Sequence, residues 1–275
     1  MAFTIQTNVS SLIALDNLRV NGDFQSRTIQ RLTSGYRINS SGDDAAGLAV
    51  ANQFRSDVAE LTQGVRNAND GISTLQIVDG GLNNISKLLD RLKALATQSA
   101  SDTFLGDRAT LDAEFTTLLT EIDRQAANIG LNTGGTNNAA ALAVFIGGGD
   151  VQANSQVTID LTAVEVDSAG LGIDGDTVAT AADALTALTN IDAAVATLGL
   201  GAGAVGTGQN RLQFAIDLAQ SQISSFSAAE SRIRDADVAA EAANLTKAQV
   251  LQQSTLAALS QANAAPQQVV SILLR

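Results

Sequence analysis

Apolar residues recur every three or four positions over two long stretches of this chain, and this spacing predicts long helices. Between residues 54 and 96 the steps alternate between four and three, with one extra step of three between residues 72 and 78. A second run with the same alternation covers residues 212–233. Such heptad-like spacing predicts a left-handed helical bundle. Because a single apolar stripe stays exposed to water, the two helices are expected to pack together.

Shorter periodic segments predict the remaining helices. Residues 8–33, a segment from about 177 to 198, and a last segment over about 237–272 all have helical apolar spacing. Pro266 lacks a backbone N–H and is expected to kink or end the last helix. Asp107 follows a short turn, so we expect it to cap a helix that returns antiparallel to the long one.

Residues 141–166, approximately, predict a small β-hairpin. Val157, Ile159 and Leu161 alternate with polar residues, which is the period-two pattern of a strand. The segment 199–208 contains five glycines, which cost a helix roughly 4–5 kcal/mol relative to alanine, at about 1 kcal/mol each. Either the helix breaks there or packing overrides helix propensity. The predicted fold is mainly α, a long antiparallel coiled-coil helical bundle with both termini paired, plus this hairpin.

Charge and composition exclude several functions. The chain of 275 residues has 16 basic and 28 acidic residues, a net charge of −12, so nucleic acid and anionic membranes are unfavourable partners. It contains no cysteine and no histidine, which removes the common nucleophile–base pairs and thiolate metal sites. No stretch reaches the roughly 18 apolar residues of a membrane span. We expect no catalytic residue, no cofactor and no metal.

Three short motifs admit a chemical interpretation, and each has a structural one. Gly201, Gly203 and Gly206 match G-x-G-x-x-G, but the dinucleotide motif requires a preceding strand. Asp174 and Asp176 resemble part of a calcium loop but supply too few ligands, so a turn is favoured. The pair at residues 43–44 is interpreted as helix capping rather than as acid/base chemistry.

The two ends of the chain closely resemble bacterial flagellin. The resemblance is carried by LTSGYRINSSGDDAAGLAV (32–50), VRNANDGISTLQIVDGGL (65–82) and the block ESRIRDADVAAEAANLTKAQVLQQSTLAALSQANAAPQQVVSILL (230–274). It implies a structural subunit that self-assembles into the flagellar filament for swimming. A hook–filament junction protein of the same family is the alternative.

The resemblance also implies a domain organisation. Residues 1–43 with 236–275 correspond to the inner-tube domain of terminal helices. Residues 44–235 correspond to the outer-tube helical domain with the hairpin, without additional variable outer domains. The apolar seams of the terminal helices are expected to mediate assembly; the residues concerned are Leu12, Leu15, Leu18, Leu245, Leu256 and Leu259. We expect the terminal helices to fold on assembly.

Partners follow from the same resemblance. They are other copies of the chain, the flagellar type III export apparatus, an export chaperone and the filament cap. The resemblance also implies that the protein is extracellular, in the flagellar filament, and is secreted without a cleaved signal peptide. Flagellins are also bound by Toll-like receptor 5, and the residues that match that site are Arg91, Leu95, Gln98 and Glu114. Asp90 and Ala94 depart from the pattern. A secreted enzyme on a flagellin scaffold would need a catalytic insert with metal-ligand motifs in the middle of the chain.

Overall fold

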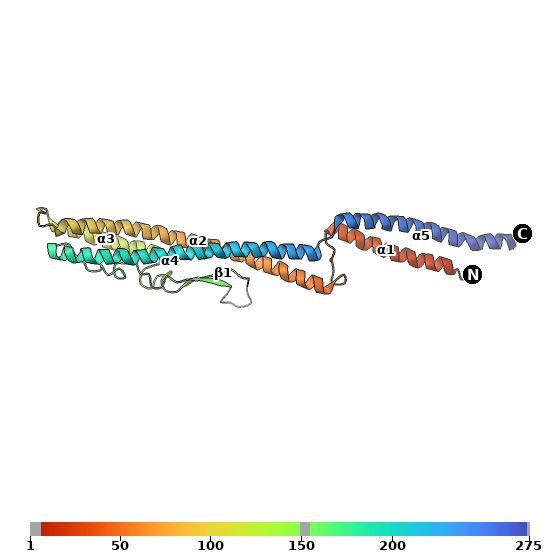
Figure 1. Cartoon of the computed structure of the whole chain (residues 1–275), viewed down its shortest axis with the longest axis horizontal. Helices are drawn as coiled ribbons and strands as arrows, with labels where there is room; N and C mark the ends of the chain where they lie inside the picture. The colour runs from red at the N-terminus through yellow and green to blue at the C-terminus, as the bar shows by residue number, and fades with distance from the viewer. Residues whose placement is uncertain (1–6, 149–154, 274–275) are drawn as a thin grey trace. The chain divides into compact units, whose positions relative to one another are not determined.

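The computed structural model describes residues 7–148 and 155–273, and it confirms the predicted fold class. The chain divides into two compact units. Unit 1 comprises Met1–Ser56 and Ser225–Arg275, and unit 2 comprises Asp57–Ser224. The elements are α1 (Val9–Ser34), α2 (Ala45–Ala100), α3 (Arg108–Asn128), β1 (Leu142–Phe145), β2 (Gln156–Ile159), α4 (Ala181–Arg234) and α5 (Val238–Leu273) (Figure 1).

Helix α2 follows the predicted seam and forms the core of unit 2. The seam residues from Leu75 to Ala96 are at most 2% exposed. Helices α3 and α4 lie beside α2 in Figure 1, and Lys93 of α2 pairs with Asp192 of α4 at 2.5 Å. As predicted, Asp107 caps α3 by accepting a hydrogen bond from the Ala109 N–H. Asp44 accepts one from the Gly47 N–H at 2.9 Å, in the capping role expected for this acidic pair.

The hairpin packs closely against α2 because glycine occupies the contact positions on that helix. Strands β1 and β2 pair antiparallel, with Leu142 opposite Ile159. A methyl group at Gly64 of α2 would overlap the carbonyl oxygen of Ile146, and one at Gly71 would lie 2.9 Å from Val144 Cγ2. These glycines lie seven residues apart, so they share one face of α2 and allow the hairpin to approach its backbone.

The glycine-rich segment 199–208 stays helical within α4. A Cβ at Gly201 would lie 2.6 Å from Val164 Cγ1, and one at Gly208 would lie 2.8 Å from Ile159 Cγ2. Both positions are buried on the same seam as Val205. The second alternative from the sequence therefore holds: tertiary packing against the hairpin and its following loop overrides the low helix propensity of glycine.

Several boundaries and faces differ from the prediction. The hairpin predicted over about 141–166 is shorter than expected, and its second strand ends at Ile159. The strand ends there because the Asp160 carboxylate accepts hydrogen bonds from the N–H and hydroxyl of Thr162 and so forms a turn. Helix α5 continues past Pro266 instead of ending there. In α4 the apolar spacing over about 177–198 was only partly right: Ile191 and Leu198 are buried, but Leu185 is 59% exposed and the small Ala184 is buried beside it.

Candidate assembly surfaces

In unit 1, α1 and α5 pair antiparallel through polar and small side chains. The amide of Asn8 donates to the Ala262 carbonyl oxygen at 2.8 Å, and Asn21 Nδ2 donates to Thr255 Oγ1 at 3.1 Å. At the other end of the pair, Arg31 Nη1 lies 3.4 Å from Glu241 Oε1. Polar groups placed between two helices fix their register at some cost in stability. The seam therefore specifies how the termini pair without burying many large apolar side chains.

The seam on α5 is shifted from the predicted stripe. Leu245 and Leu259 are half-buried, and Leu256 is 49% exposed. The positions that face α1 include Glu241 and Ala248, at 8% and 0% exposure. On α1, Ala14 is buried and Leu18 half-buried, whereas Leu12 and Leu15 are 57% and 48% exposed. Three of the six assembly residues predicted from the sequence therefore project to solvent, and three lie partly within the pair.

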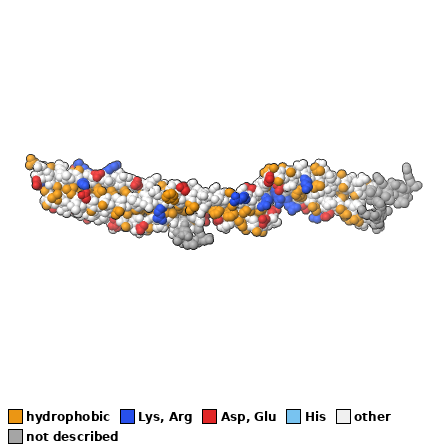
Figure 2. All heavy atoms as spheres, in the orientation of Figure 1, with side chains coloured by type: hydrophobic (Ala, Val, Ile, Leu, Met, Phe, Trp, Pro, Cys, Tyr) orange, Lys and Arg blue, Asp and Glu red, His pale blue; other side chains and the backbone are white. Residues whose placement is uncertain are grey.

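The outward surfaces of both helices carry further large apolar side chains that the sequence stripe did not include. Figure 2 shows hydrophobic side chains exposed over α1 and α5. The exposed residues absent from the prediction are Val9, Ile13, Val20, Val250 and Leu251. Apolar residues at adjacent positions, such as Leu12 and Ile13, are the signal that could have revealed them, because neighbours on a helix cannot share one narrow stripe.

Beside this seam lies an open groove with a cavity volume of about 410 Å³. Its wall consists mainly of small residues, including Ser10, Ala14, Ser254 and Ala258, with Ile13 at one edge. None of the described residues that line it is charged, so they offer no group for acid/base chemistry. Its open shape and its small, uncharged side chains suit insertion of a side chain from another helix.

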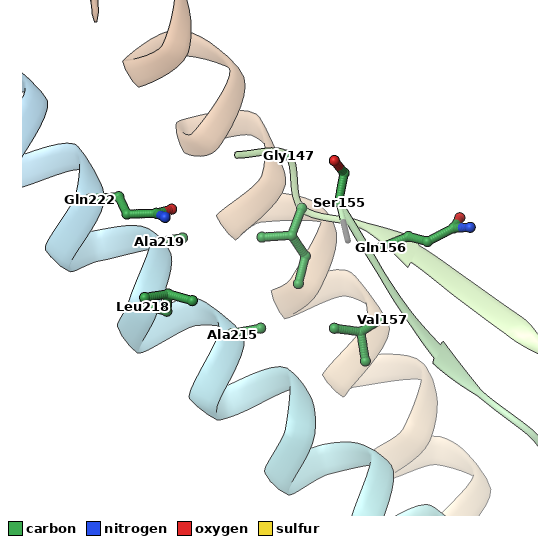
Figure 3. Close-up of a pocket in the computed structure, with 9 residues that line it drawn as sticks. Gly147, Ser155, Gln156, Val157, Ala215, Leu218, Ala219 and Gln222 are labelled. Carbon is green, nitrogen blue, oxygen red and sulfur yellow. The ribbon is translucent and has the colours of Figure 1, made fainter. Parts of the chain in front are cut away.

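A smaller hollow in unit 2 lies between the hairpin and α4. Figure 3 shows Ala215, Leu218 and Gln222 of α4 on one side and Ser155 and Val157 of the hairpin segment on the other. The cavity volume is about 70 Å³, well below the roughly 300–1,000 Å³ of ligand pockets. This hollow is a packing gap rather than a substrate site.

The segments that lead into and out of the terminal helices pair within unit 1. The Arg37 N–H donates to the Arg234 carbonyl oxygen at 2.7 Å, and the Ala236 N–H donates to the Gly35 carbonyl oxygen at 2.9 Å. The Arg234 guanidinium lies 4.1 Å from the centre of the Tyr36 ring. Gly35 has a φ of 75°, a left-handed conformation that glycine adopts readily and that ends α1. The two connections are thus held side by side.

The four residues matching the receptor site lie on α2 and α3. Arg91 Nε donates to Glu114 Oε1 at 2.8 Å, and both side chains remain partly exposed. Gln98 is exposed, whereas Leu95 is 1% exposed and packs in the core of unit 2. Three of the four side chains are therefore accessible in the folded unit.

The remaining motifs have structural roles. Asp176 accepts hydrogen bonds from Asn190 Nδ2 at 2.9 and 3.1 Å, and partial burial raises the pKa of its carboxyl. Among the described residues, no group of three or more acidic side chains could hold a metal ion. The G-x-G-x-x-G residues lie inside α4 and follow a helix rather than a strand. Nothing in these motifs assembles a reactive site.

Paired helices with exposed apolar side chains beside an open groove are typical of a structural protein with an interaction surface. Comparison with known proteins gives the family. The bacterial flagellin N-terminal helical region matches residues 5–133, and the C-terminal helical region matches residues 188–273. The flagellin of Halalkalibacterium halodurans is 33% identical over 274 residues, covering 98% of this chain and 99% of that protein.

Other relatives agree. The flagellin of Listeria monocytogenes is 34% identical over 98% of this chain and 99% of its own length. The chain belongs to the bacterial flagellin family, which is a family of structural proteins rather than enzymes, and its place there is that of a flagellar filament subunit. Near-complete matches to flagellins do not favour the junction-protein alternative.

Proposed function

We propose that this chain self-assembles into the extracellular helical filament that a bacterium rotates to swim. The observation that carries this proposal is the outward apolar surface of the α1–α5 pair, on which Leu12, Ile13 and Leu256 are each about half exposed or more. An exposed apolar surface of this kind is typical of an interaction site. Identical subunits that meet through two different surfaces form an open helix rather than a closed ring.

The family supports the other elements of the proposal. Residues 1–43 with 236–275 form the inner-tube domain, and residues 44–235 form the outer-tube domain. The described chain between α3 and α4 holds only the short strands β1 and β2 besides turns and loops, which favours a filament without extra outer domains. The proposal also includes export through the type III apparatus and binding of an export chaperone and the filament cap. It further includes recognition by Toll-like receptor 5 through Arg91, Gln98 and Glu114.

Seeded polymerisation of the purified full-length chain tests the proposal. Sedimentation and negative-stain microscopy are expected to show filaments from the full chain and none from a version lacking residues 1–40 and 237–275. Leu256→Asp is expected to abolish assembly while leaving unit 2 folded, because a carboxylate cannot be buried against an apolar partner without a large desolvation cost. Leu259→Asp is expected to do the same.

A matched control separates charge from position. Gln253→Asp adds the same negative charge to α5 at a position that is already polar and exposed, so it is expected to assemble like the parent chain. A full-length chain that stays monomeric with seeds present would contradict the proposal, as would normal assembly of Leu256→Asp.

A further inference from the structure

Helix α1 contains the only step of the chain in which glycine follows asparagine, at Asn21 and Gly22. In such a step the backbone nitrogen of the glycine can attack the side-chain carbonyl carbon of the asparagine, because glycine has no Cβ to obstruct the approach. The attack closes a succinimide ring and releases the side-chain nitrogen as ammonia. Water then opens the ring and leaves aspartate or isoaspartate. This deamidation needs no reactant other than water.

The α1–α5 pair holds both reacting groups of this step. The Asn21 amide nitrogen, which would leave as ammonia, donates to Thr255 Oγ1 of α5 at 3.1 Å. Gly22 lies inside α1, where a backbone N–H points along the helix axis and donates to the carbonyl oxygen four residues earlier. Its nitrogen is therefore not directed at the Asn21 side chain. An intact α1 prevents the ring closure.

Little besides the helix itself provides this protection. Among the described residues of α1, only Ala14 and Thr28 are buried. A Cβ added at Gly22 would meet no atom within 4 Å, so no packing contact at that position adds to the hydrogen bonds of the helix. Glycine also lowers helix stability by about 1 kcal/mol relative to alanine. Local opening of α1 at this step is therefore easier in a single chain than in one whose outer surface other copies cover.

Deamidation would damage the contact that sets the register of the pair. The Thr255 hydroxyl already donates to the Leu251 carbonyl oxygen at 2.7 Å, so its oxygen faces position 21 as an acceptor. An aspartate carboxylate has no hydrogen to donate to it, and isoaspartate would add an atom to the backbone of α1. No cation lies three or four positions away to pair with the new charge, since these residues are Asn17, Leu18, Phe24 and Gln25.

We propose that Asn21 is a deamidation site of the unassembled chain, which α1 protects once other copies cover it. Chains that remain unassembled convert Asn21 with time, and the converted chains pair α1 with α5 less well and are left out of assembly. The site itself depends only on the chemistry of Asn21 and Gly22. The exclusion of converted chains rests in addition on the proposed function.

The test follows Asn21 in the full-length chain by peptide mass spectrometry and by ammonia release. Monomer, seeded filaments and chain unfolded in guanidinium chloride are incubated at the same mildly alkaline pH. Conversion is expected to be fastest in guanidinium chloride and slower in filaments than in monomer by about tenfold or more, because the reaction requires local opening of α1. Asn39 is the internal reference, since the following Ser40 N–H already donates to Asp43 Oδ2 at 3.0 Å, and it should convert more slowly than Asn21 in the monomer.

Gly22→Ala is the matched variant. It leaves Asn21 in place, adds a methyl group where there is room and obstructs the attack. In guanidinium chloride, where helix stability plays no part, it is expected to remove most of the conversion. Monomer of the parent that has been aged is expected to lose polymerising chains in proportion to its converted fraction, with converted Asn21 enriched in the supernatant, whereas aged Gly22→Ala keeps its full yield of filaments.

Equal conversion rates in monomer and filaments would overturn the protection by α1. Rapid conversion of Gly22→Ala in guanidinium chloride, or conversion of Asn39 before Asn21 in the monomer, would overturn the site. Equal converted fractions in filaments and supernatant would overturn the exclusion from assembly. If fresh parent chain does not polymerise, the proposed function fails, which is a different result because conversion in the monomer and in guanidinium chloride still decides the site.

Discussion

The contact between the hairpin and α2 makes a sharp prediction about two glycines of the same helix. Gly64 is buried, and a methyl group there would overlap the backbone carbonyl oxygen of Ile146. Gly80 is exposed, with nothing within 4 Å of an added Cβ. Alanine is favoured over glycine in a helix by about 1 kcal/mol. Gly64→Ala and Gly80→Ala gain the same helix propensity. The difference between their free energies of unfolding therefore measures the contact between the hairpin and α2 at Gly64.

Gly80→Ala is expected to stabilise the chain by roughly 0.5–1 kcal/mol. Gly64→Ala gains a similar amount but forces the hairpin backbone away from α2. Overpacking of this kind costs about 1–3 kcal/mol. We expect a cost near the upper end of this range because the added methyl group meets the Ile146 backbone rather than a flexible side chain. The net effect expected for Gly64→Ala is a loss of about 1–2 kcal/mol, the difference between these terms.

Urea unfolding of the monomer, followed by far-ultraviolet circular dichroism, measures both variants against the parent. The Gly80→Ala midpoint should move up and the Gly64→Ala midpoint down, with similar slopes. Equal stabilisation by the two substitutions would show that the hairpin does not press against α2 at Gly64. A lower midpoint for Gly80→Ala would refute the helix-propensity part of the reasoning.

Three further predictions concern caps, titration and the terminal pair. Asp44→Ala removes the cap of α2 and should cost about 1 kcal/mol, measured by urea unfolding. Hydrogen bonds from Arg124, then Gln125, lower the pKa of Glu121 to about 2 in the folded chain. Because the folded-state pKa is depressed, the ionised carboxylate should stabilise the fold above pH about 4.5, and this stabilisation should be lost as the pH falls toward 2. An NMR titration of the Glu121 carboxyl measures this pKa. Arg31→Leu should lower the depolymerisation temperature of filaments because Glu241 then stays buried without its cation, and adding Glu241→Leu should restore part of it.

Prediction from the sequence succeeded where large apolar residues define the buried face. The seam of α2 was visible because Leu75, Ile85 and Leu92 occupy it, and all three are fully buried. Alternation of Val157 and Ile159 likewise placed the hairpin. In these elements, side-chain size and burial point to the same positions, so periodicity alone is sufficient.

Prediction failed where close packing selects small residues. In α4 the sequence pattern placed the buried Ile191 and Leu198 correctly, but it also included Leu185 and Val195, which are exposed. It missed the small buried residues Ala184, Ala187 and Gly201. A pattern that scores hydrophobicity ranks leucine above glycine and therefore overlooks buried positions that are occupied by small residues. The helix break considered at 199–208 has the same origin, since the contacts of Gly201 with Val164 depend on tertiary structure.

The assembly residues show why this distinction matters for function. The α1–α5 pair places Ala14, Thr28 and Ala248 between its helices and leaves residues such as Leu12 and Leu256 outside. Full burial of a leucine side chain contributes about 1.5–3 kcal/mol of stabilisation. An exposed leucine that another copy covers therefore contributes more free energy than an alanine that is buried between α1 and α5. Most of the stabilisation available to the terminal helices therefore comes from neighbouring copies. Their folding should be coupled to assembly, and dilution should loosen α1 and α5 before it affects unit 2.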